Sequence, residues 1–116
     1  RDALTHYRVA ARYRAHTRLD VQLATGRTHQ IRVHMAYIGH PLLGDTTYGA
    51  RVVLPSEPAD ELDRSVRGFA RPALHARRLE FDHPDTGKAC EFHSDWPDDF
   101  AELAGACAAD AARPAA

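Results

Sequence analysis

The residues best suited to chemistry lie in one stretch, TGRTHQIRVHMAYIGHPLLGDTTYG, which runs from Thr25 to Gly49. Gly26 lets the chain turn tightly into a helix, and the free N–H groups at a helix N-terminus attract anions. Arg27 adds a planar donor beside them, which suits a phosphate or a carboxylate. The bland alternative, with Thr28 only as a cap and Arg27 as a surface charge, stays open on the residues alone.

The histidines of this stretch lack the spacing of a metal site. His29 and His34 lie about 140° apart around a helix, so they do not share a face as a zinc pair at i, i+4 must. Cys90 and His93 could chelate a metal, but no second pair follows them. The sequence also has no GxSxG turn and no glycine-rich nucleotide loop. We therefore expect no metal site.

Two strands and one helix must position this stretch. Residues 4–13 alternate aromatic or apolar side chains with basic ones, and residues 17–24 alternate again, which is typical of strands. Only a short link joins the two segments, so we expect them to pair antiparallel. A helix is predicted over residues 28–38, directly after the Gly26 turn.

The predicted helix has one apolar stripe. Ile31, Met35 and Ile38 recur at i, i+4 and i+7, and Gly39 ends the pattern. Arg32 falls beside the stripe rather than opposite it. Its side chain can therefore lie at the rim of a cleft while the helix packs on the sheet.

The rest of the chain reads as a second helix, a hairpin and a last helix. Apolar spacing predicts a short helix over residues 59–69, and alternation predicts strands at 73–82 and 89–94 around a turn. Pro97 opens a final helix. We expect its alanine-rich end, residues 104–116, to fray.

Composition points to one domain, or to a piece of one. The 116 residues are 44% hydrophobic, and the two cysteines are too few for a disulfide scaffold, which fits a reducing, cytoplasmic setting. No run of about 18 apolar residues could span a membrane. Residues 1–40 hold seven arginines against two aspartates, a net +5, whereas residues 41–116 hold eight cations against fourteen acids, a net −6. A basic segment of this kind favours RNA, although a solvated strand face explains it equally well.

The Thr25–Gly49 string, followed by RPALHARRLEFDHPDTGK, resembles the C-terminal half of the catalytic domain of the RluA-type pseudouridine synthases. The likeness covers about residues 5–100. GRTHQIRVHM, GHPLLGD and LHA at these separations are highly specific, whereas short pieces such as GRT are not. Members that act on large-subunit ribosomal RNA are the most similar, and transfer-RNA members share the same strings.

The resemblance implies a fold and a reaction. The fold would be α+β, with a mixed, largely antiparallel sheet flanked by short helices around an active-site cleft. The activity would be the isomerisation of uridine to pseudouridine in RNA, without a cofactor or a metal. Residues 1–116 would form the C-terminal portion of the catalytic domain, and the missing N-terminal half would be a partner of this piece. The start at Arg1 instead of Met fits such a fragment.

The resemblance also implies roles for individual residues. The family's nucleophile is an aspartate on an upstream HRLD-type motif, and Arg32 matches the arginine that forms an ion pair with it. Ile31 would help to line the uracil pocket. Arg27, His29 and Gln30 would contact the pocket or the RNA phosphates. For Asp45 and His75 we favour a structural role.

One short string in the sequence resembles the family's nucleophile motif. Thr17-Arg18-Leu19-Asp20 contains RLD, but the preceding histidine is replaced by Thr17, and the family's following Thr-Ser-Gly is absent. We therefore expect Asp20 to be an ordinary strand residue and the chain alone to be inactive. The alternative function is a catalytically empty RNA-binding module of the same fold. A small interaction domain without an RNA role is a third reading.

Overall fold

The structure is a computed structural model that describes residues 5–23, 28–76, 78–82 and 85–114. Within them, helices and strands alternate irregularly along the chain, as expected for an α+β fold. Their order is β1 (Thr5–Arg12), β2 (Thr17–Leu23), α1 (Thr28–Tyr37), the 3₁₀ helix η1 (Thr46–Tyr48), α2 (Asp60–Gly68), β3 (Arg78–Asp82), β4 (Ala89–His93) and α3 (Asp98–Ala111).

The first two strands form the predicted antiparallel hairpin. Tyr7 lies opposite Val21 and Val9 opposite Leu19, so the alternating apolar side chains share one face of the ladder. The turn between the strands is closed by the amide of Tyr13, which donates to the carbonyl of His16 at 2.8 Å. Both predicted strands and their pairing are confirmed in the described residues: β1 ends at Arg12, one residue earlier than expected, and β2 begins at Thr17, as expected.

The second hairpin is formed by β3 and β4, with Leu79 opposite Phe92. In the described part of the chain it is a separate two-stranded sheet, not hydrogen-bonded to β1 or β2. The predicted strand at 73–82 begins only at Arg78. Before it, Ala73 donates its amide to the carbonyl of Leu43 at 2.8 Å, a loop contact that replaces strand pairing. The α+β class and the antiparallel pairing are confirmed.

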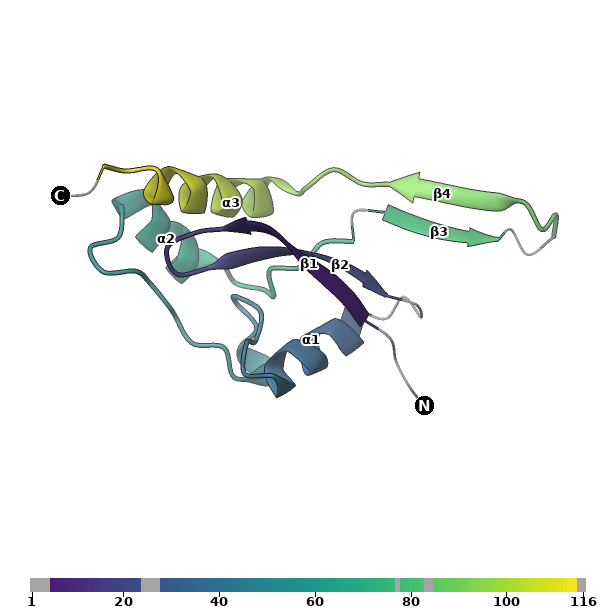
Figure 1. Cartoon of the computed structure of the whole chain (residues 1–116), viewed down its shortest axis with the longest axis horizontal. Coiled ribbons are helices and arrows are strands. Elements are labelled where there is room, and N and C mark those ends of the chain that lie inside the picture. Colours follow the sequence, from purple (N-terminus) through teal and green to yellow (C-terminus); the bar gives the residue numbers. More distant parts are fainter. Residues whose placement is uncertain (1–4, 24–27, 77, 83–84, 115–116) are drawn as a thin grey trace.

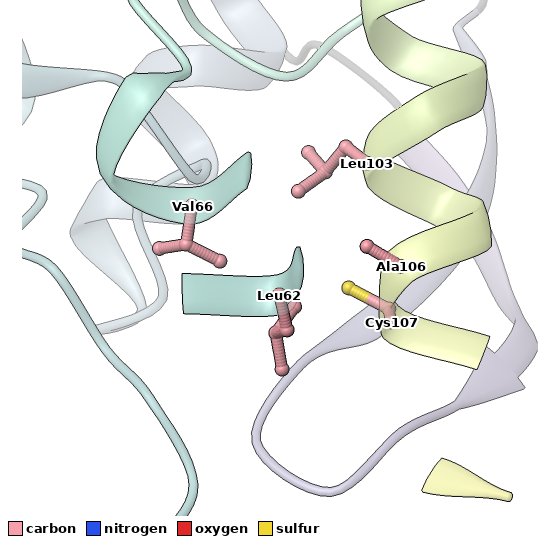
Figure 2. Packing of buried hydrophobic residues seen from close by; sticks show 5 residues of the cluster. All are labelled: Leu62, Val66, Leu103, Ala106 and Cys107. Carbon is pink, nitrogen blue, oxygen red and sulfur yellow. The ribbon is translucent and has the colours of Figure 1, made fainter. Parts of the chain in front are cut away.

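The main hydrophobic core lies between α2 and α3 (Figure 2). Leu62 and Val66 are one turn apart on α2, so they project from the same face towards α3. The side chains in this cluster are at most 6% exposed, and they are Leu62, Val66, Leu103, Ala106 and Cys107. Half-buried side chains close its margin, among them Tyr13 from the first hairpin and Leu43 from the loop after α1.

The segment expected to fray, residues 104–116, is helical over most of its described part. Helix α3 continues to Ala111, because its last two turns bury Ala106, Cys107 and Asp110. The alanine-rich composition hid this packing: small side chains let the helix approach α2 closely. The final residues 115–116 lie outside the described part.

The molecule is elongated. Its radius of gyration is 16.2 Å, against about 13 Å for a compact chain of this length, and its extents are 58 × 27 × 23 Å. Figure 1 shows the cause: the β3–β4 hairpin projects beyond the body, in which β1 and β2 run between α3 and α1 in this view. Among the described residues, no helix has the length and apolar character needed to cross a bilayer.

Candidate active site

The site is organised by helix α1. Ile31 and Met35, one turn apart, are both 8% exposed and form the packing face of the helix. Arg32 follows Ile31 and is therefore rotated by about 100° to the edge of that face. Its side chain is 25% exposed, at the border between the body and solvent.

The predicted third member of the apolar stripe is not part of the packing face. Ile38 is 41% exposed, because α1 ends at Tyr37 and the chain turns away. The amide of His40 donates to the carbonyl of Met35 at 2.8 Å, and Gly39 adopts a φ of +90° in this turn. This is the expected glycine-terminated helix end, one residue earlier than predicted.

Arg32 forms a two-pronged ion pair with Asp45. Its Nε donates to Oδ2 at 3.0 Å and its Nη2 to Oδ1 at 2.9 Å. The Asp45 side chain is fully buried, so this pair neutralises a carboxylate that would otherwise be costly to remove from water. The hydrogen bond to Asp45 is the main reason that the pKa of Arg32 is raised above its ordinary value.

The loop that carries Asp45 is anchored to the segment before β3. Gly44 has a φ of +83°, and a Cβ atom there would lie 2.1 Å from the carbonyl oxygen of Arg71. Only glycine fits so close to another backbone segment. The Leu43–Ala73 hydrogen bond holds the same two segments together. The buried carboxylate is thus presented to Arg32 from a fixed loop.

Tyr48 completes the surroundings of the guanidinium. Its ring centroid lies 5.1 Å from Arg32 Cζ, within the range of a cation–π contact. Its hydroxyl is 2.8 Å from Nε2 of His29, and the two rings meet edge to face with centroids 5.5 Å apart. Asp45 therefore holds one edge of the guanidinium while Tyr48 covers one face.

One edge of the Arg32 guanidinium is still available. Within the described residues, no hydrogen bond leads from its Nη1, whereas Nε and one N–H of Nη2 are taken by Asp45. An arginine has five N–H donors in a rigid plane. The arrangement can therefore bind a second anion, a carboxylate or a phosphate, along the Nη1 side.

The structure brings most of the predicted site residues together on α1. His29 is exposed, Gln30 is half-buried, Ile31 is buried and Arg32 lies at the rim. Arg27 lies outside the described residues. The α1 residues can form a surface and one wall of a pocket. Because Ile31 lies on the packing face of the helix, it can line a pocket only where another segment approaches that face.

Asp20 is an ordinary strand residue in this structure. Its carboxylate lies 3.6 Å from Nη2 of Arg8, directly across the β1–β2 ladder. Both side chains are largely exposed, at 52% and 83%. An exposed pair of this kind contributes little to stability. Asp20 also lacks the burial that is typical of a catalytic carboxylate.

The basic first third of the chain is less available to RNA than its charge implies. Arg14 pairs with the buried Asp110, Arg18 lies over the ring of Trp96 at 4.9 Å, and Arg32 holds Asp45. These three cations serve internal contacts. Net charge along the sequence therefore overstates the phosphate-binding surface.

The sequence favours a structural role for Asp45, and it assigns no role to Tyr48. Asp45 and Tyr48 match family strings, but nothing local separates a buried hydrogen bond from an RNA contact. The useful signal is the glycine before Asp45, since a glycine that approaches another backbone often fixes the residue beside it. His75 is similar: its Nε2 lies 3.0 Å from the carbonyl oxygen of Ser94, at the base of the β3–β4 hairpin.

Comparison with known proteins gives the family of this chain. The profile of the family described as RNA pseudouridylate synthase matches residues 1–37, which span the first hairpin and α1. The match includes Arg32 on α1 and ends before Asp45 and Tyr48.

Relatives along most of the chain agree with this family assignment. The protein named ribosomal large subunit pseudouridine synthase D from Vibrio cholerae is 57% identical over 109 residues, which are 94% of this chain and 34% of that protein. Proteins of the same name from Pseudomonas aeruginosa and Xanthomonas campestris are 54% and 50% identical, over 84% and 99% of the chain and 31% and 35% of their own lengths. The chain belongs to the RluA-type family of RNA pseudouridine synthases, and it spans about a third of the length of these relatives.

Proposed function

We propose that this chain is the C-terminal portion of the catalytic domain of a parent enzyme that isomerises uridine to pseudouridine in RNA. Large-subunit ribosomal RNA is the favoured substrate, because the relatives from Vibrio, Pseudomonas and Xanthomonas are all named for it. The enzyme would work in the cytoplasm. The observation that carries the proposal is the Arg32 guanidinium, oriented by Asp45 and Tyr48 with one edge available to an anion.

In this proposal the anion is the carboxylate of an aspartate from the rest of the catalytic domain. A carboxylate in a partly desolvated pocket tends to take up a proton, and a guanidinium beside it keeps it ionised and aimed. Lysine would be a poorer partner because it lacks the planar fork. Arg32 is thus the catalytic residue of this chain, and the nucleophile comes from the missing half.

The surface of the first hairpin supports a partner segment of this kind. Tyr7 is 55% exposed and Val9 is 40% exposed on the apolar face of β1. Each strand of this hairpin pairs with only one other strand in the described part of the chain. The missing half of the catalytic domain would cover this face and extend this sheet.

RNA would approach from the exposed side of α1. The target base must leave the helical stack before its glycosidic bond can break, so the pocket has to receive an extruded nucleotide. His29 is exposed beside Tyr48, Gln30 follows it in sequence, and Arg27 precedes it by two residues. We assign these three residues to the RNA backbone or the pocket rim, and Ile31 to the apolar wall of the uracil pocket.

The test uses the parent enzyme with its nucleophile in place. Arg32→Ala should abolish turnover of tritium-labelled RNA in a tritium-release assay while RNA affinity changes much less. The control is Arg67→Ala, because Arg67 is an exposed arginine whose ion-pair partner among the described residues is Asp63, one turn away on α2. Full activity of Arg32→Ala would refute the catalytic role.

The reading frame upstream of Arg1 separates the enzyme from an RNA-binding module without chemistry. An in-frame segment with an HRLD-type motif supports the enzyme. For the empty module, RNA affinity should still fall steeply with salt, since arginine–phosphate contacts release counterions, but no tritium should be released.

A further inference from the structure

We propose that Asp45 is a positioning residue for the reaction: it fixes the plane of the Arg32 guanidinium so that the Nη1 edge meets the nucleophilic carboxylate. This inference rests on the proposed function. It gives Asp45 a specific task in the reaction, beyond the structural role that the sequence favours.

The geometry of the pair leaves little freedom to the guanidinium. Two parallel hydrogen bonds, from Nε and Nη2, fix both the position and the plane of the group. The ring of Tyr48 adds a cation–π contact, with its centroid 5.1 Å from Cζ. A side chain with this many rotatable bonds would otherwise sample many orientations at a surface.

The carboxylate that does the holding is itself immobile. Asp45 is 1% exposed, and its amide donates to the carbonyl of Leu42 at 2.9 Å. Its own carbonyl accepts from Tyr48 at 3.2 Å and from Ala50 at 3.0 Å. The backbone of Asp45 therefore also helps to fix Tyr48, which is the other residue in contact with the Arg32 guanidinium.

A second arginine–aspartate pair in the same chain shows what a purely structural version looks like. Arg71 binds Asp99 with the same fork, Nε at 3.0 Å and Nη2 at 2.8 Å. Its Nη1, however, donates to the carbonyls of Pro72 and Leu74 at 3.3 and 3.4 Å. Arg71 is thus used on every side, whereas Arg32 keeps its Nη1 edge available.

The charge of Asp45 affects how Arg32 acts on the nucleophile. Asp45 already neutralises the guanidinium, so Arg32 mainly orients a second carboxylate and donates hydrogen bonds to it, and compensates its charge less. Removal of the Asp45 charge should leave a stronger positive field at the nucleophile. A neutral residue at position 45 would then ease ionisation of the nucleophile while it impairs its alignment.

The experiment compares Asp45→Asn with Asp99→Asn in the parent enzyme. Asparagine cannot accept from both Nε and Nη2, because one of its two terminal atoms is itself a donor. We expect kcat of Asp45→Asn to fall about 100-fold, the scale of a misplacement near 1 Å, with KM for RNA little changed. Asp99→Asn should keep its kcat, although it breaks a fork of the same geometry.

A pH profile adds a readout that a merely structural role would not move. The acid limb of kcat/KM reports ionisation of the free enzyme's essential base. For Asp45→Asn it should shift to lower pH by about 1 unit, because a negative charge near the nucleophile has been removed. Circular dichroism and thermal unfolding of both variants establish that each is folded at the assay temperature.

Several outcomes decide the matter. A folded Asp45→Asn enzyme with unchanged kcat and an unmoved acid limb would overturn the positioning role, while an active wild type and an inactive Arg32→Ala variant would leave the proposed function standing. An inactive wild-type parent enzyme would overturn both. Should Asp45→Asn not fold, Asp45→Glu, which moves the carboxylate by one methylene, takes its place, and full kcat there would contradict the proposal.

Discussion

Asp110 and Arg14 are 96 residues apart in sequence and form a part-buried ion pair, with Arg14 Nη1 3.1 Å from Oδ2 and 3.3 Å from Oδ1. Asp110 is 1% exposed, and it also accepts from the amide of Ala59 at 2.8 Å. Nη2 of Arg113 lies 3.5 Å from Oδ1 of the same carboxylate. This carboxylate joins the turn after β1, the start of α2 and the end of α3.

Replacement of Asp110 should therefore destabilise the whole body. In Asp110→Asn a buried arginine contact and an amide lose their anionic acceptor, and we expect the thermal unfolding midpoint of the chain to fall by about 10 °C. Glu102→Gln is the matched control, because Glu102 is exposed on the same helix and should change the midpoint by less than about 2 °C. Equal unfolding midpoints for the two variants would show that the contacts of Asp110 do not stabilise the fold.

The same carboxylate makes the chain sensitive to acid. The amide of Ala59 and the guanidinium of Arg14 hold the pKa of Asp110 below its ordinary value. A carboxyl group with a lower pKa in the folded state stabilises that state above its unfolded pKa, about 4, and the contribution is lost as the pH falls through the folded value. Unfolding midpoints measured from pH 6 down to pH 2.5 should drop, with a smaller drop in Asp110→Asn. Parallel curves would contradict this assignment.

Gly44 should tolerate no side chain. Gly44→Ala places a methyl group against the Arg71 carbonyl and forces alanine into the left-handed region, with an expected loss of more than about 2 kcal/mol in the free energy of unfolding. Gly49→Ala is the control, since Gly49 has a φ of +90° but open space around it, and should lose only about 1 kcal/mol. Chemical denaturation measures both. Equal losses would mean that the close approach of the two loops is dispensable.

Cys107 should be inert in the folded chain. Burial against α2, helped by the charge of Asp110, raises the pKa of its thiol to about 11. At pH 8 the reactive thiolate is therefore scarce as well as shielded. In a Cys90→Ser background, we expect a thiol-reactive chromophore to label Cys107 only when denaturant is added. Stoichiometric labelling within minutes in native buffer would show that the α2–α3 core opens readily.

Local patterns were sufficient for most of the secondary structure. The alternation around Val9 and Val21 and the spacing of Ile31 and Met35 are set by neighbours a few residues away, so the first hairpin and α1 could be predicted closely. The strand predicted from residue 73 begins only at Arg78. Local patterns did not indicate that α3 continues into its alanine-rich end. A run of alanines carries no periodic signal, and its order depends on the surface of α2 against which it packs.

The sequence by itself determined the family, the hairpins and the helix that carries Arg32, because these depend on local strings and on short-range periodicity. Only the tertiary structure decided what each charge does: that Arg32 holds Asp45, that Arg14 holds Asp110 and that Asp20 stays on the surface. The physical reason is that a buried ion pair requires two side chains to meet at hydrogen-bond distance where solvent is excluded. That meeting is set by chain packing over 13 or 96 residues, and no local pattern encodes it.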